Sequence, residues 1–247
     1  MDCSYTPAEV KEKQEVSAQT GTMAENPSDV FAPGCSFYKL ACLFFLGAFL
    51  GDIVETIFCY FTMGKWMSRS SVVFGPFSIV WGLGCALLTA LLYRWRDSGN
   101  GFIFLFGTVM GGIYEYLCSV FTEKLFGTIF WDYSSLPLNL GGRINLTYCF
   151  FWGIAAILWL KVLYPPVSRR IERIPKEKGL LVTRFMIVFM VFNILVSSLA
   201  LNRYTQRTVN GAPAVTSLDH ILDKQFPDAK MKAIYPKAKA VIQQNQP

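Results

Sequence analysis

Three acidic side chains lie within long apolar stretches of this sequence. Asp52 and Glu55 are three residues apart on one helix face, and Glu115 follows Glu55 after 60 positions. A charged side chain at the centre of a bilayer costs about 3 kcal/mol on insertion scales, so it normally faces protein or water and has a partner. Neighbouring carboxyl groups can also share a proton. The three acids are therefore candidates for binding a proton or a solute.

The sequence offers little other reactive chemistry. His220 is its only histidine and lies outside the apolar stretches, which excludes imidazole metal sites and Ser-His or Cys-His catalysis there. The seven cysteines form no CxxC pair, and most lie in or beside apolar stretches, where cysteine behaves as a small hydrophobic residue. No GxxxxGK(S/T) loop for nucleotide phosphates occurs. We predict a protein that is not an enzyme, with no catalytic residues, no metal and no cofactor.

The composition indicates a membrane protein. Hydrophobic residues make up 53% of the 247 residues and charged residues 16%, against about 25% charged residues in an ordinary soluble domain. The apolar residues gather in stretches of about 20, the length with which a helix crosses roughly 30 Å of hydrocarbon. Basic residues beside such stretches set topology or contact anionic lipid. We therefore predict the lipid bilayer as a partner and no nucleic acid.

The predicted fold is an all-α membrane protein with about five transmembrane helices. Residues 1–36 are polar and contain three prolines, so we expect a disordered tail. Residues 202–247 return to a soluble composition and are expected to hold short helices bounded by proline. The transmembrane domain then covers residues 37–201, with spans at 37–61, 72–93, 101–121, 144–163 and 180–201.

The loop between the fourth and fifth spans predicts the orientation. Short loops rich in lysine and arginine stay in the cytoplasm. With five spans, the N-terminus is then cytoplasmic and the C-terminal tail lies outside. The loop is also expected to form a short interfacial helix with Val167, Ile171 and Ile174 on its lipid side. Its basic residues are Arg169, Arg170, Arg173, Lys176 and Lys178.

The acids belong to an internal sequence repeat. Gly47, Gly51 and Glu55 follow one another at intervals of four in the first span, and the third span has Gly107, Gly111 and Glu115 at the same intervals. Glycines spaced in this way let two helix backbones approach closely within lipid. Trp81-Gly82 and Trp152-Gly153 correspond in the second and fourth spans. We predict that spans 1–2 and 3–4 form a parallel repeat, as in some transporters.

Polar residues of the connecting segments are expected to meet these acids. The segments after the first and third spans emerge on the same side of the predicted bundle. A polar pocket is therefore predicted there, covered by the connection at 122–143. An alternative is that ion pairs only lock the bundle. The predicted pocket residues are Asp52, Glu55, Arg69, Glu115, Trp131, Asp132, Tyr133 and Arg143.

Two polar residues lie within the fifth span. Asn193 is near its centre, and Arg184 is near its beginning. We expect Asn193 to serve helix packing. Arg184 is expected to extend its charged end toward the interface, as long basic side chains do in membranes.

Several motifs resemble one bacterial family. They are Phe74-Gly75-Pro76, Trp131-Asp132-Tyr133-Ser134, Gly142-Arg143-Ile144 and Trp152-Gly153. Together they resemble the CmpB-like membrane proteins described as ABC-transporter type IV, over about residues 37–165. The resemblance implies a multipass protein of the bacterial cell membrane that is associated with transport and works with a separate ATPase subunit. Asp52 departs from the family, whose members often carry tryptophan there.

Three functions remain open from the sequence. The first is a permease-like transport component without its own ATPase. The second is a membrane scaffold or regulator, in which the same polar residues only hold helices together and the tails bind another membrane protein. The third is a lipid-modifying enzyme that uses the membrane carboxylates as acid or base. Since no nucleophile motif is present, the third has the least support.

Overall fold

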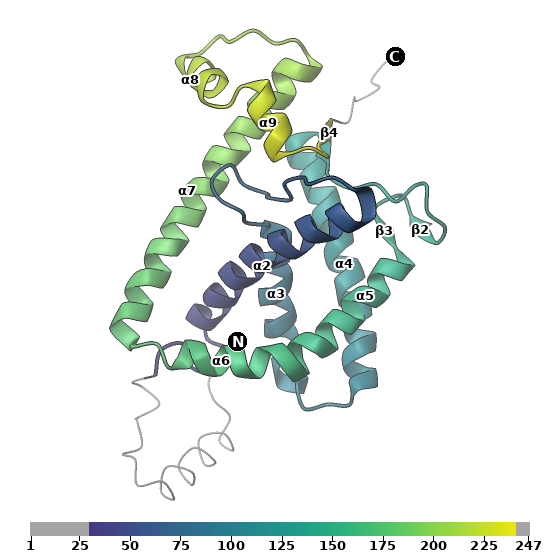
Figure 1. Ribbon diagram of the computed structural model, residues 1–247, viewed down its shortest axis with the longest axis vertical. Helices are drawn as coiled ribbons and strands as arrows, with labels where there is room; N and C mark the ends of the chain where they lie inside the picture. Colours follow the sequence, from purple (N-terminus) through teal and green to yellow (C-terminus); the bar gives the residue numbers. More distant parts are fainter. Residues whose placement is uncertain (1–29, 241–247) are drawn as a thin grey trace, which may run out of the picture.

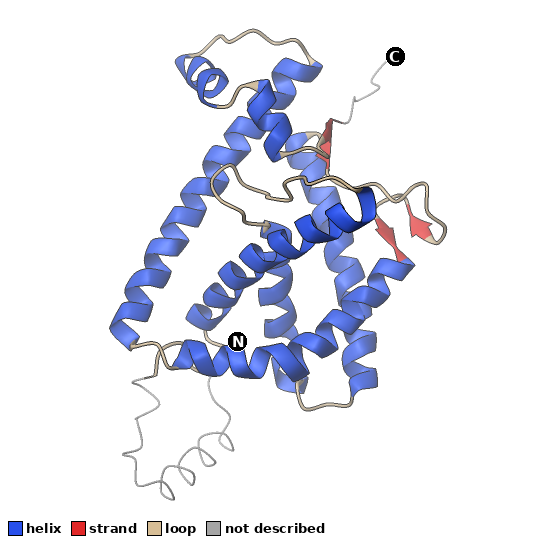
Figure 2. Cartoon of the chain, in the orientation of Figure 1, coloured by secondary structure: helices blue, strands red, loops and turns tan. Residues whose placement is uncertain are grey.

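The computed structural model describes residues 30–240, and most of them are helical (Figures 1 and 2). Most of the predicted disordered tail therefore lies outside the described residues. Four two-residue strands make two small antiparallel pairs, in which β1 (Thr128–Ile129) pairs with β4 (Lys239–Ala240) and β2 (Asn139–Leu140) with β3 (Ile144–Asn145). The helices are α2 (Phe37–Met63), α3 (Ile79–Leu92), the 3-10 turn η1 (Tyr93–Trp95), α4 (Asn100–Phe126), α5 (Leu146–Ile157), the π-helical η2 (Leu158–Leu163), α6 (Tyr164–Glu172), α7 (Lys176–Val209), α8 (Ser217–Gln225) and α9 (Asp228–Ile234).

The all-helical membrane fold predicted from the sequence is confirmed. Four helical stretches of the described chain are long and apolar enough to cross a bilayer, namely α2, α4, α7 and the continuous run Leu146–Glu172. A fifth apolar helix, Ile79–Trp95, is shorter. It occupies the second predicted span, 72–93, which is helical only from Ile79.

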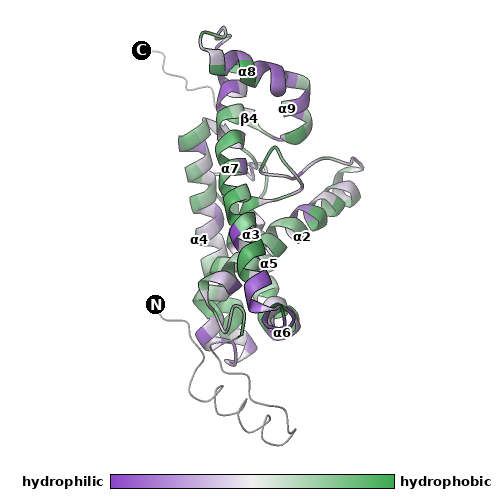
Figure 3. Ribbon diagram, turned by 90° about the vertical axis from the view of Figure 1, so that its left-hand side faces the viewer, coloured by the Kyte–Doolittle hydropathy of each residue, from purple (hydrophilic) through white to green (hydrophobic). Residues whose placement is uncertain are grey.

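The helices run between two polar ends. Figure 1 shows α2, α4 and α7 rising toward the end that carries α8 and α9, whereas α3 and α5 descend toward the end that carries α6. Hydrophilic residues gather in α6 at one end and in α8 and α9 at the other, with the apolar middle of α7 between them (Figure 3). The described chain therefore starts and finishes at opposite ends of the helix bundle.

Non-helical backbone between α2 and α3 is bound to the middle of α7. Asn193 is completely buried there, and its amide accepts from the Phe74 N–H at 3.2 Å and donates to the Phe74 carbonyl at 2.7 Å. Ser197, one turn later, accepts from the Val73 N–H at 2.9 Å. Irregular backbone is tolerated at membrane depth only where protein groups or water satisfy it. Asn193 thus does more than the predicted helix packing, since it replaces the missing helical hydrogen bonds.

A π-helical turn joins α5 to α6 without a break. The Tyr164 N–H bonds to the Trp159 carbonyl, five residues back, immediately before Pro165 and Pro166. Proline lacks an N–H and its ring clashes with the carbonyl four residues earlier, so a wider turn accommodates the pair. The helix then changes direction, and α6 lies across the end of the bundle (Figure 1).

The predicted helix after the proline pair is present as α6, but Ile171 does not face lipid. It is buried in a cluster with Phe31, Leu43 and Tyr164. The opposing surface also holds the fully buried Lys39 of α2, which bonds to the Ser168 hydroxyl at 2.5 Å and pairs with Glu172 at 2.9 Å. Since Ile171 and Ser168 lie one turn apart, this face of α6 is the one packed on protein.

Replacing Glu172 by glutamine should lower the free energy of unfolding by about 2 kcal/mol. Breaking a buried ion pair costs about 3–5 kcal/mol, but Glu172 is 14% exposed and Lys39 keeps its bonds to Ser168. The double replacement Lys39→Met with Glu172→Gln should recover most of the loss, because no buried charge remains. Unfolding in mixed detergent measures both values, and a double variant weaker than Glu172→Gln would contradict the account.

The C-terminal helices pack onto α7 and the neighbouring connections. Tyr235 also donates to the Ser71 carbonyl at 3.2 Å, and β4 pairs with β1 after α4. The residues that follow the last predicted span are therefore docked on the bundle as far as Ala240. The buried members of this apolar cluster are Ala200, Leu201, Leu222, Phe226, Met231 and Tyr235.

Ion pairs fasten α8 to the end of α7. Arg203 makes two bonds to Asp223, at 2.9 and 2.7 Å, and Arg207 reaches the same carboxylate at 2.6 Å. Hydrogen bonding from Arg203, reinforced by Arg207, lowers the pKa of Asp223 to about 2. A carboxyl group whose pKa is lowered on folding stabilises the fold above its unfolded pKa of about 3.9 and loses that contribution as the pH falls through the folded value.

We therefore expect α8 to loosen between about pH 4 and pH 2. Pepsin cleavage of residues 212–235 in the detergent-solubilised protein should accelerate over this range. Asp223→Asn should already be cleaved faster than the parent protein at pH 4, because the variant lacks the carboxylate that binds Arg203. Asp97→Asn is the control, because Asp97 is 91% exposed and its ion pair with Arg96 is long, at 3.7 Å. Equal resistance of Asp223→Asn and the parent protein at pH 4 would contradict the prediction.

Candidate functional site

Two tryptophans lie directly over the glycines of the predicted repeat. A Cβ added to Gly51 would overlap the Trp81 side chain of α3, and a Cβ added to Gly111 would overlap Trp152 of α5 in the same way. Only glycine lets the indole carbon atoms lie this close to the facing backbone. The helix pairs α2–α3 and α4–α5 are thus joined by the same contact, a tryptophan packed on a glycine of the facing helix.

The glycines one turn earlier make matching contacts. A Cβ on Gly47 would lie 2.6 Å from the Cβ of Cys85, and one on Gly107 would lie 2.6 Å from the Cβ of Ala156. Cys85 and Ala156 each stand four residues after the tryptophan of their own helix. The parallel internal repeat stays a prediction, which these paired contacts support.

Each tryptophan donates its indole N–H to the glutamate of the facing helix. Trp81 Nε1 lies 2.9 Å from Glu55 Oε2, and Trp152 Nε1 lies 3.3 Å from Glu115 Oε2. The two indole rings are themselves neighbours, with centroids 5.8 Å apart. Glu55 and Glu115 are close enough to interact electrostatically. The structure therefore gathers both acids around one central pair of tryptophans.

The connecting segments supply a second donor to each acid. Arg69 donates to Glu55 through Nε, at 2.8 Å, and through Nη2. Tyr133 donates its hydroxyl to Glu115 Oε1 at 2.7 Å and stacks on Tyr148 of α5, with centroids 4.8 Å apart. Four of the predicted pocket residues, Glu55, Arg69, Glu115 and Tyr133, thus lie in one cluster with the two tryptophans.

Asp52 is buried beside this cluster with an incomplete set of partners. Only 6% of it is exposed, and within the described residues its Oδ1 atom has no hydrogen-bond donor. The charges of Glu55 and Arg69 both act on it. Buried polar atoms are satisfied in the great majority of cases, so an exception in a native protein needs an explanation. Asp52 is the one acid of the three that the surrounding chain leaves available for a further donor.

Three other predicted pocket residues build the covering connection instead. Asp132 accepts from the Ser134 N–H at 3.0 Å, and Trp131 donates to the Arg143 carbonyl at 2.9 Å. The Arg143 side chain pairs with Glu123 and reaches Ser119 at 3.2 Å, rather than Glu115. These residues shape the segment that carries Tyr133.

Gly142 is required for this turn. Its φ of +69° lies in the left-handed region, and an added Cβ would overlap the Ser134 hydroxyl. Its carbonyl accepts from the Tyr133 N–H at 2.8 Å, which fixes the position of Tyr133 above Glu115.

The predicted pocket included Tyr133 but missed three other aromatic residues of the cluster. Trp81 and Trp152 were expected only as markers of the repeat, although their indole N–H groups hold the acids. Tyr114 was not singled out, yet it donates to the Val80 carbonyl at 2.6 Å and packs edge-on against Trp152. The available signal was position, because Tyr114 precedes Glu115 and each tryptophan begins a Trp-Gly pair.

The fold and this cluster define a multipass helical membrane protein with buried acids between two similar helix pairs. The chain belongs to the family described as "Putative ABC-transporter type IV", which it matches over residues 42–198. It is therefore a membrane protein of a transport-related family. No curated protein and no solved structure matches the chain.

Proposed function

We propose that this protein is a permease-like component of a transport system, in which a separate subunit hydrolyses ATP. The observation that carries the proposal is Asp52, a buried carboxylate with a vacant acceptor beside the Glu55–Arg69 pair. Intramembrane acids of this kind face a protein interior or a water-filled path and bind ions, protons or solutes. Family membership supports the same function.

The other two acids of the cluster are less available to a solute than Asp52. Glu55 and Glu115 already receive two kinds of donor each, so a solute gains little by binding them directly. Asp52 lies one helical turn before Glu55 and next to Gly51, which carries Trp81 against its backbone. We propose that a cationic or hydrogen-bonding group of the solute, or a proton, binds the Oδ1 atom of Asp52 and so supplies its missing donor. No catalytic role is proposed for these acids.

Asp52→Asn should raise the free energy of unfolding by about 1 kcal/mol, since an amide is cheaper to bury than a charge and the repulsion between Asp52 and Glu55 is removed. Stability gained by replacing a site residue is typical of functional positions. Glu55→Gln provides the comparison and should lower stability, because it weakens the bonds from Arg69 and Trp81. Detergent unfolding measures both. A loss of stability in Asp52→Asn would show that Asp52 has a structural role.

The ATPase subunit is proposed to contact the α6 end of the bundle. Arg169 and Arg170 of α6 are exposed there, with Arg173 and Lys178 nearby. We propose that this end is cytoplasmic, which makes the N-terminus cytoplasmic and the protein a component of the bacterial cell membrane. The outward end, with α8 and α9, then covers the connections that carry Arg69 and Tyr133.

A photo-crosslinker in place of Arg170 tests the proposal in native membranes. An ATPase subunit should be captured and identified by mass spectrometry. The same probe at Leu218 of α8, which is 48% exposed, is the control from the opposite end and should not capture it. No ATPase captured at Arg170, or equal capture at both positions, would overturn the proposed partner and orientation.

A membrane scaffold is the second candidate, because Glu55 and Glu115 are fully used in holding helices and connections together. In that case the probe at Arg170 or Leu218 should capture one other membrane protein and no ATPase. The two functions are therefore separated by the same experiment.

A further inference from the structure

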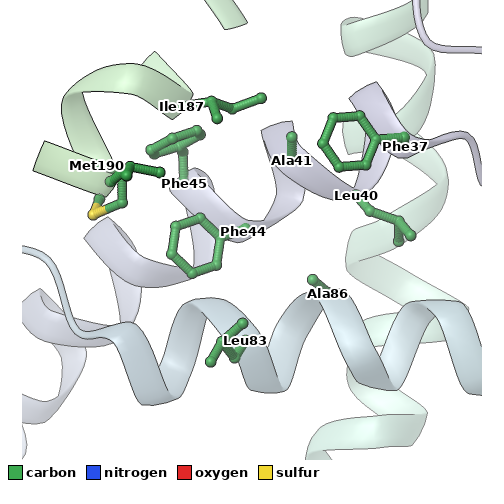
Figure 4. Close-up of a pocket in the computed structure, with 10 residues that line it drawn as sticks. Phe37, Leu40, Ala41, Phe44, Phe45, Leu83, Ala86, Ile187 and Met190 are labelled. Atoms are coloured by element: carbon green, nitrogen blue, oxygen red, sulfur yellow. The ribbon is translucent and has the colours of Figure 1, made fainter. Parts of the chain in front are cut away.

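An apolar pocket of about 350 Å³ lies between α2, α3 and α7 (Figure 4). Phe44 of α2, Leu83 of α3 and Met190 of α7 converge on it, and Phe37 lies at its end near the start of α2. Its volume is within the range of about 300–1,000 Å³ that is usual for ligand pockets. All of its lining residues are apolar, and they include Ala41 of α2, Ala86 of α3 and Ile187 of α7.

Polar contacts between α2 and α7 border this pocket on the side of α6. Arg184 donates through Nε to the Tyr38 hydroxyl at 3.1 Å, and the Cys42 thiol lies 3.6 Å from the Thr183 hydroxyl. Tyr38 is adjacent to Phe37, and Arg184 is one turn before Ile187, so both polar residues neighbour residues of the pocket wall. An apolar space with one polar border is the shape that an acyl chain and its headgroup require.

Arg184 supplies charge at this border. It is exposed, and no carboxylate of the described chain pairs with its guanidinium. Only its Nε atom bonds to Tyr38, and the guanidinium has five N–H donors in a planar fork that matches phosphate. A long basic side chain in a membrane helix extends toward the headgroup region. The free donors of Arg184 are therefore suited to a lipid phosphate.

We propose that this site binds an anionic phospholipid, with an acyl chain in the pocket and the phosphate on Arg184 and Tyr38. The exposed arginines of α6 at the same end add the positive charge that attracts anionic headgroups. The acyl chain of the lipid packs against Phe44, Leu83 and Met190. The phosphate replaces water on the side of the Arg184 guanidinium that does not face Tyr38. This site is separate from the Asp52 cluster and does not depend on the proposed transport function.

Native mass spectrometry of the intact protein tests the proposal by titration with phosphatidylglycerol and with phosphatidylcholine. One phosphatidylglycerol should bind at least tenfold more tightly than phosphatidylcholine. Arg184→Gln should weaken phosphatidylglycerol binding about tenfold. Lys161→Gln is the matched control with little expected effect, because Lys161 is an exposed basic residue just before α6 that donates to the Ser98 carbonyl at 2.9 Å and does not line the pocket. Ala86→Trp should fill the pocket and weaken binding similarly, whereas Leu105→Trp, at a position 64% exposed on α4, should not.

Each variant is first checked for an unchanged melting temperature in detergent. Ala41→Trp, from the opposite wall of the pocket, replaces Ala86→Trp if that variant does not fold. Equal binding of the two lipids, equal effects of Arg184→Gln and Lys161→Gln, or unchanged binding in the filled pocket would each overturn the proposal. The proposal would also be overturned if the protein forms a dimer without lipid and the tryptophan variant that fills the pocket abolishes this dimer. A second copy of the protein, and not a lipid, would then occupy the pocket.

Discussion

Asn193→Leu is expected to lower the free energy of unfolding by about 4 kcal/mol. The variant removes both bonds between the Asn193 amide and the backbone of Phe74, and leucine cannot replace either. A buried backbone group left unsatisfied costs about 1–3 kcal/mol. Two such groups are exposed to an apolar interior at once, where water is not available to satisfy them. Unfolding in mixed detergent micelles gives the value directly.

Ser198→Ala is the matched control for Asn193→Leu. Ser198 lies on the same helix, but within the described residues its hydroxyl bonds only to the Ile194 carbonyl of α7 itself, at 2.8 Å. Its replacement should change stability by less than about 0.5 kcal/mol, as is usual away from buried networks. If Asn193→Leu is also close to neutral, the segment that contains Phe74 does not depend on α7 for its hydrogen bonds.

The helices were predictable wherever one continuous apolar stretch makes one helix. The second span was predicted too long because residues 72–78 are apolar, and hydropathy alone does not distinguish a helix from buried irregular backbone. Gly75 and Pro76 were the available signal. Gly75 has φ of +83°, and proline cannot donate to a helical ladder. The partner that makes this geometry stable, Asn193, lies more than 100 residues later and could not be inferred from local sequence.

The candidate site was predictable where spacing alone decides position. Glu55 and Glu115 share an offset within their helices, so the predicted repeat implied similar surroundings for both. The partners did not follow, because they depend on how the connections fold. Arg143 was expected near Glu115, but the turn at Gly142 directs its side chain to Glu123. The sequence showed which basic and polar residues lie on the same side of the bundle as Glu55 and Glu115. It did not show which of them bonds to which glutamate.

Gly111→Ala should lower the free energy of unfolding by about 3 kcal/mol, the upper part of the usual range for overpacking. The added methyl group would overlap the Cβ and Cγ atoms of Trp152. Those atoms belong to the rigid base of the side chain, so α4 and α5 must separate. Separation would also lengthen the bond from Trp152 to Glu115, which is already 3.3 Å. The loss should therefore appear in stability and in the tryptophan fluorescence.

Gly101→Ala on the same helix shows whether the effect comes from packing. Apart from its own helix backbone, a Cβ at Gly101 would meet no atom of residues 30–240 within 4 Å. Alanine should therefore be neutral there or raise stability by up to about 1 kcal/mol through its better helix propensity. Gly51→Ala should repeat the loss seen at Gly111, since Trp81 lies over Gly51 in the same manner. A large loss of unfolding free energy in one of Gly51→Ala and Gly111→Ala, with none in the other, would mean that the two helix pairs do not contribute equally to stability. The similarity of the two pairs would then be a property of the sequence alone.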